Sequence, residues 1–223
     1  MIPRQDLLRR RAWRHPEWPL VPVAALAWVL LALPAVHGLG LWVVWVVMAA
    51  AMTLPTVLPG ARRVALNGLW RWRGRAVALF AVAHLAVWAA VGVVAVPAGE
   101  LVRGAVGPYA PAVVTGSLLL AAAWEITPAK RRALRAGHRT AVVPPAGRAA
   151  VAGLVREGAR HGGRCVGSCG VLMAGLAVAG HGALLIMLPL TGIVVVQKLA
   201  RRGTEYAGTA AVVLVGTAAL AAI

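Results

Sequence analysis

The chain has 223 residues, of which 61% are hydrophobic and only 13% are charged. A soluble domain of this length cannot bury so much apolar surface, so composition predicts an integral membrane protein. Lys and Arg number 23 against 6 Asp and Glu, and the arginines gather between apolar runs. This distribution predicts cytoplasmic loops that contact anionic lipid head groups, and without a basic-aromatic motif it argues against nucleic-acid binding.

The chain starts with a basic tail over residues 1–18, and a single transmembrane helical domain is expected over residues 19–223. The apolar run after the tail has no convincing small-residue cleavage site, which predicts a retained signal-anchor. Spans of roughly 17–21 residues are long enough to cross ~30 Å of hydrocarbon. About seven are expected, near Leu20–Val36, Leu41–Leu58, Ala76–Val96, Ala110–Ile126, Cys165–Gly180, Ala183–Leu199 and Tyr206–Ile223.

The loops between these spans alternate in charge. The tail, Arg62–Arg75, Lys130–Arg164 and Lys198–Arg202 are basic, whereas the loops at Gly38–Gly40, Pro97–Pro108 and Gly180–Gly182 carry one arginine between them. Seven spans place every basic segment on one side of the membrane, which is the cytoplasmic side by the positive-inside rule. The fold class predicted is therefore all-α, a polytopic transmembrane helix bundle with its N-terminus inside and its C-terminus outside.

The longest polar stretch is a basic cytoplasmic segment at residues 129–164, broken by Pro144-Pro145. Within it, Arg148–Arg160 has helical spacing, with an apolar face opposite its arginines. An amphipathic helix of this kind is expected to lie on the membrane surface.

The residues most capable of chemistry begin where this segment ends. His161, Cys165, Cys169 and Met173 follow one another at intervals of four residues. Side chains four apart on a helix lie nearly above one another, so the four form a ladder of nitrogen and sulfur donors. Each interval of four residues rotates the side chain around the helix by roughly 40°. Neighbouring donors can therefore bind one ion together, but all four cannot.

Two other spans carry donors at a similar depth, in the inner half of the membrane. Met48 and Met52 share a face of the second span, and His84 lies in the third, about 12 Å from its inner end at 1.5 Å per residue. Thiolate, thioether and imidazole together suit Cu(I), and Zn fits less well because methionine binds it poorly. The alternative is packing, because free cysteine is a common small core residue and methionine fills irregular gaps.

The polar residues outside this donor set do not predict a further binding or catalytic site. Glu125, Gln197 and Lys198 lie near the inner ends of spans, and Glu125 is expected to pair with a nearby lysine or arginine as a structural tie. His37 and His181 lie at outer turns, but a haem site is not expected because no attachment motif accompanies them. A dithiol redox role for the cysteines is disfavoured by their spacing on a regular helix. No catalytic triad, phosphate loop or paired acidic motif is present, so an enzyme is not expected.

Several stretches together resemble a bacterial family described as predicted metal-binding integral membrane proteins (domain of unknown function, DUF2182). The resemblance covers about residues 40–200 and rests on Trp45–Pro55, Trp124–Lys130, Gly158–Cys169, Leu172-Met173 and Gln197-Lys198. It implies metal binding, with copper handling often suggested, in a bacterial cytoplasmic (inner) membrane.

The chain departs from the family pattern at a few positions. Ser168 replaces one of two adjacent cysteines, which leaves two thiols rather than three, and His181 replaces a methionine. Glu125 and Gln197 exchange the usual Gln and Glu, which hints that these two side chains face each other.

The leading hypothesis is therefore a multi-pass Cu(I)-handling protein that uses Cys165 and Cys169, assisted by Met173, Met52 or His161. It would act as a chaperone or assembly factor for a membrane cuproenzyme, or in copper transfer. The alternative is a non-catalytic accessory subunit of a membrane complex with no bound metal. Both hypotheses predict another membrane protein or complex as partner.

Overall fold

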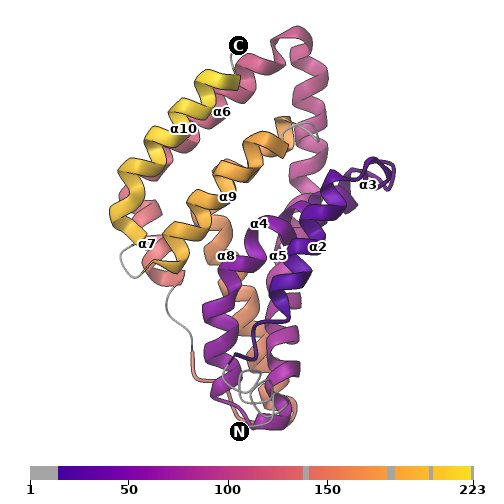
Figure 1. Ribbon diagram of the computed structural model, residues 1–223, viewed down its shortest axis with the longest axis vertical. Coiled ribbons are helices and arrows are strands. Elements are labelled where there is room, and N and C mark those ends of the chain that lie inside the picture. The colour runs from indigo at the N-terminus through magenta and orange to yellow at the C-terminus, as the bar shows by residue number, and fades with distance from the viewer. Residues whose placement is uncertain (1–14, 138–140, 180–183, 201–202, 222–223) are drawn as a thin grey trace, which may run out of the picture.

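The computed structural model describes residues 15–137, 141–179, 184–200 and 203–221, and this part of the chain is all-helical (Figure 1). Short 3-10 turns η1 (Trp70–Trp72), η2 (Gly107–Tyr109) and η3 (Gly203–Tyr206) connect some of the helices. The α-helices are α2 (Leu20–Ala32), α3 (Pro34–His37), α4 (Leu41–Leu66), α5 (Arg73–Val106), α6 (Ala110–Glu125), α7 (Pro128–Gly137), α8 (Gly147–Ala179), α9 (Leu184–Leu199) and α10 (Ala207–Ala221).

Three stretches of helix are long and apolar enough to cross a membrane: α4, Trp70–Val106 and α8. A fourth arises if α6 and α7, which are bent by 73° at their junction, count as one broken span. The expectation of an all-α chain is met in the described residues, whereas the seven spans and the orientation of the termini stay predictions.

Two helices continue through prolines at which a span was expected to end. The predicted loop over Pro97–Pro108 is wrong, because α5 runs through Pro97 to Val106. Likewise, α4 contains Pro55 and Pro59 and continues to Leu66. A proline inside a helix leaves the carbonyl four residues earlier without its usual donor. For Pro55 that carbonyl belongs to Ala51, and the indole Nε1 of Trp28 donates to it at 3.1 Å.

The basic segment also differs from the prediction. Arg148–Arg160 is helical but not a separate surface helix, because α8 runs without interruption from Gly147 to Ala179. Its apolar side packs against α5, where a Cβ at Gly158 would lie 2.5 Å from the carbonyl oxygen of Phe80. A Cβ at Gly162 would lie 3.1 Å from the carbonyl oxygen of His84. Small residues four apart let two helix backbones approach closely, so this face meets α5 rather than lipid.

The helices form two connected groups (Figure 1). α8 and α4 both pack on α5, and α2 packs on α4, while α6 and α10 lie side by side as a second group. The two groups are joined where α6 packs on α8 and where α9 contacts both α4 and α10. The cysteines of α8 share a buried cluster with Met48 and Met52 of α4, and Lys198 of α9 reaches Cys165.

Candidate metal centre

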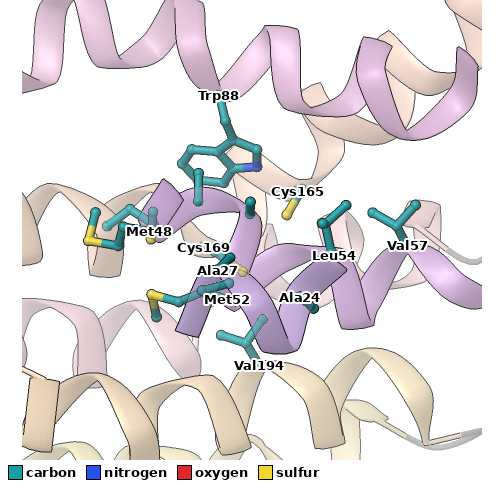
Figure 2. Close-up of a cluster of buried hydrophobic side chains, with 14 of the residues drawn as sticks. Ala24, Ala27, Met48, Met52, Leu54, Val57, Trp88, Cys165, Cys169 and Val194 are labelled. Atoms are coloured by element: carbon teal, nitrogen blue, oxygen red, sulfur yellow. The ribbon is translucent and has the colours of Figure 1, made fainter. Parts of the chain in front are cut away.

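The donor ladder of α8 lies inside the bundle. Its four members, His161, Cys165, Cys169 and Met173, are between 1% and 6% exposed. Both cysteines and Met173 belong to one hydrophobic cluster that also contains Met48 and Met52 of α4. Figure 2 shows Met48, Met52, Cys165 and Cys169 within this cluster. The structure thus brings the sulfur donors predicted on two different helices into the same buried region.

The two thiols are free and contact each other. Their side chains lie on neighbouring turns of one helix face and interact electrostatically. The hydroxyl of Ser168 donates to the carbonyl oxygen of Cys165 at 3.0 Å and lies 3.4 Å from the sulfur of Cys169. Ser168, where the family resemblance implies a further cysteine, thus makes polar contacts with both cysteines.

An ammonium group faces this thiol pair from another helix. Lys198, in the last turn of α9, donates from Nζ to the Sγ of Cys165 at 2.7 Å and also interacts electrostatically with Cys169. A cation this close stabilises negative charge on the sulfur atoms, and the thiolate is the form of cysteine that binds metals. From the sequence, Lys198 was interpreted as a structural residue. Its contact with Cys165, 33 residues earlier on another helix, leaves no local pattern in the sequence.

A pocket leads to the thiols. Its lining includes Cys165, Ser168 and Lys198 together with His161, and Arg63 and Arg164 also line it. The charged lining residues are therefore all cationic. The positive charge of these walls stabilises negative charge inside the pocket, such as that of two thiolates with a bound Cu(I) ion.

His84 lies next to the ladder on α5 and is fully buried. Its Nε2 is 3.0 Å from the hydroxyl of Thr53, and its ring centre is 5.4 Å from that of His161. The ring centre of Phe80 also lies 5.4 Å from that of His161. Thr53 was missed by sequence reasoning, although a polar residue directly after Met52 in an apolar run is a usable signal.

The number of donors restricts the metal. Within the described residues, no three His, Cys, Asp or Glu side chains are grouped closely enough to hold an ion. Structural zinc sites require four such ligands, whereas Cu(I) favours soft sulfur ligands. Two buried thiols with thioethers nearby therefore suit Cu(I) better than Zn.

A second polar cluster adjoins the thiols. The carboxylate of Glu125 accepts hydrogen bonds from Lys130 Nζ and from Gln197 Nε2, each at 2.6 Å. All three side chains are only 1% to 2% exposed. This cluster ties the bend between α6 and α7 to α9, and Glu125 and Gln197 do face each other.

His181 lies outside the described residues, and the side chain of His37 is outside the description as well.

Comparison with known proteins agrees with this donor set. A family model described as a copper chaperone, PpoB2, matches residues 42–221. No curated protein and no solved structure matches the chain. The family description supports the metal-binding resemblance seen in the sequence and names the metal, although it does not carry the domain-of-unknown-function label. Because the match covers most of the 223 residues, this chain belongs to the copper chaperone family.

Proposed function

We propose that the protein is an integral membrane Cu(I) chaperone that carries one ion between the sulfur atoms of Cys165 and Cys169. The observation that carries this proposal is a pair of buried thiols on neighbouring turns of α8, with the ammonium of Lys198 2.7 Å from Cys165 Sγ. The copper chaperone family match supports the identity of the cargo.

The charges of such a site would balance. Two thiolates and one Cu(I) ion carry a net charge of −1, which the ammonium of Lys198 neutralises. An uncompensated charge in an apolar interior is strongly unfavourable, so a neutral site is far easier to bury. Without the ion, Lys198 can stay hydrogen bonded to the sulfur atoms, which keeps the site organised for loading.

Delivery to a partner fits the chain better than pumping does. A transport path needs polar groups along its length, and the buried acidic and amide side chains described here are already partnered. Glu125 and Gln197 are bonded to each other, Glu17 is paired with His15 and Arg62, and Glu157 is paired with Arg160 and Arg164. We therefore propose a copper-receiving membrane cuproenzyme as partner, and no catalytic reaction for the chain itself. The apolar helices of membrane length support a location in the bacterial cytoplasmic membrane.

The test is the Cu(I) affinity of the detergent-solubilised protein, measured without oxygen by competition with a chromogenic Cu(I) chelator. Cys165→Ser/Cys169→Ser should weaken binding by more than ~100-fold, because hydroxyl groups replace both soft ligands. Met187→Leu is a matched control, since Met187 is a buried sulfur residue on α9 in the same hydrophobic cluster but is not among the proposed ligands. Equal affinities in the parent and the double variant would reject the proposed site.

A further inference from the structure

We infer that copper reaches the thiols as an anionic complex of Cu(I) with a small acidic thiol, held at the cationic pocket beside Cys165. This inference rests on the proposed copper function and names the form in which the cargo arrives. A bare Cu(I) ion and its complexes with acidic thiols carry charges of opposite sign, so the charge of the pocket walls distinguishes between them.

Four helices build this pocket. Arg63 comes from the end of α4, Arg164 from α8 and Lys198 from α9, while α7 contributes small and apolar wall residues. Among the described residues, no carboxylate lines the pocket. The Nε of Arg63 donates to the carbonyl oxygen of Pro59 at 3.1 Å, which fixes this guanidinium against α4 at the pocket wall.

The positive charge around the pocket exceeds the negative charge that offsets it. Glu157 lies 3.5 Å from Arg164 and 3.8 Å from Arg160, so one carboxylate faces two guanidinium groups. Arg63 and Lys198 add two further positive charges. A cleft with walls of one charge sign concentrates the electric field and raises the association rate of oppositely charged ligands by about 10–1000-fold. The same field repels a bare Cu(I) ion, which is a cation.

The pocket is too narrow for a whole donor molecule. Its volume is about 20 Å³, whereas one water molecule needs about 10–15 Å³. The metal and its donor atom can therefore approach Cys165 while the rest of the ligand stays outside. The side chain of Arg164 is 30% exposed and Arg63 is also partly exposed, so both can contact the outer part of the ligand.

These contacts define the chemistry of the donor. Thiolate sulfur selects Cu(I), so the donor holds the ion through sulfur. Arginine recognises a carboxylate through two parallel hydrogen bonds, so carboxylates on the donor match Arg63 and Arg164. A small thiol with free carboxylates, of which glutathione is an example, meets both requirements.

The transfer is a ligand exchange without a change of oxidation state. Two Cu–S bonds to the donor thiolates break, and two form to Cys165 and Cys169. The protons of the two cysteine thiols move to the two leaving thiolates, which depart as thiols. The copper with its two sulfur ligands keeps the same charge throughout, and Lys198 faces it after the transfer.

The experiment measures the rate of Cu(I) transfer to the full-length protein in detergent, without oxygen, by timed desalting. One preformed complex contains mercaptosuccinate and is anionic, and the other contains cysteamine and is cationic. At low salt, the ratio of the anionic to the cationic rate should fall by about tenfold or more in Arg63→Gln/Arg164→Gln, because the pocket loses attractive charge. Any effect of the arginines on the cysteines themselves slows both donors and cancels in the ratio.

Two further variants serve as controls. Arg63→Lys/Arg164→Lys keeps the positive charge and should retain most of the ratio. Arg103→Gln should retain all of it, because Arg103 is a partly exposed arginine in the last turn of α5, paired with Glu100, that does not line the pocket.

Salt provides a measurement that needs no variant. Raising the ionic strength from ~0.01 M to ~0.15 M shortens the Debye length from ~30 Å to ~8 Å. In the parent, transfer from the mercaptosuccinate complex should then slow several-fold, whereas transfer from the cysteamine complex should stay the same or accelerate. This measurement decides the question if Arg63→Gln/Arg164→Gln does not fold.

The outcomes separate this inference from the proposed function. An unchanged ratio in Arg63→Gln/Arg164→Gln, or a rate from the anionic complex that salt does not lower, would overturn the inference and leave the thiol site intact. Uptake by Cys165→Ser/Cys169→Ser equal to that of the parent, or no uptake by the parent from either donor, would instead reject the proposed function.

Discussion

Two neighbouring residues at the end of α9 serve different clusters. Gln197 donates to Glu125, whose carboxylate is also paired with Lys130, whereas Lys198 donates to Cys165. In the Glu125 cluster, the buried cation and the buried carboxylate neutralise each other. In the thiol cluster, no carboxylate forms an ion pair with Lys198 within the described residues, so the ammonium faces sulfur alone.

The difference separates a structural cluster from a binding cluster. A fully paired buried network has no remaining capacity and holds helices together. A cation that faces two thiols still has room for negative charge, which the thiolates supply when they bind Cu(I). Substitutions in the two clusters should therefore affect different properties, stability in one and copper affinity in the other.

The largest effect on stability is expected at Glu125. Glu125→Gln leaves the Lys130 ammonium buried without its carboxylate, which should lower the free energy of unfolding by about 3 kcal/mol. Thermal unfolding in detergent measures the loss. The swapped pair Glu125→Gln/Gln197→Glu should recover most of it, because a carboxylate again lies between the helices. A swapped pair no more stable than the single variant would show that the two side chains are not interchangeable.

Lys198 should show the reverse pattern. Lys198→Met removes a hydrogen bond to a charged group, worth about 1.5–3 kcal/mol, so Cu(I) affinity should fall by about 10–100-fold. Stability should stay the same or rise, because replacing a buried charge by an apolar side chain is often neutral or stabilising. Chelator competition and thermal unfolding measure the two quantities, and Lys198→Arg is the control that keeps the charge. If Lys198→Met lowers the unfolding temperature but leaves Cu(I) affinity unchanged, then Lys198 stabilises the fold and not the bound copper.

The smallest effects are expected at the methionines of α4. Met52→Leu conserves volume and should cost less than about 1.5 kcal/mol of stability. As a thioether in the thiol cluster, Met52 should contribute less than tenfold to Cu(I) affinity, since the two thiolates are the principal ligands. Met48→Leu is the matched comparison on the same helix face and should leave affinity unchanged. A loss at Met52 as large as that at the cysteines would make the thioether a principal ligand.

Sequence patterns predicted which residues share a helix face more readily than they predicted the helix boundaries. The spacing of four residues placed His161, Cys165 and Cys169 on one face of a helix, and the structure has them buried on one face of α8. The limits of α4 and α5 were misjudged because proline was expected to end a span. At Pro55, Trp28 supplies the missing donor from another helix, which no local pattern reveals.

Contacts between helices that are far apart in the sequence were also not predicted. Lys198 reaches Cys165 from α9, and Thr53 reaches His84 from α4. Neither contact lies within one helix, so no local pattern in the sequence reveals it. The exchanged Glu125 and Gln197 were an exception, because their departure from the family pattern pointed to a contact that the structure contains.

The most direct test of the account is the metal content of the protein purified from cells without oxygen, determined by mass spectrometry for the parent and for Cys165→Ser/Cys169→Ser. The account predicts copper in the parent at one equivalent or more, and a loss of at least one equivalent in the double variant. Equal copper in both proteins, or none in the parent even after reconstitution with Cu(I), would contradict the claim that Cys165 and Cys169 carry the cargo.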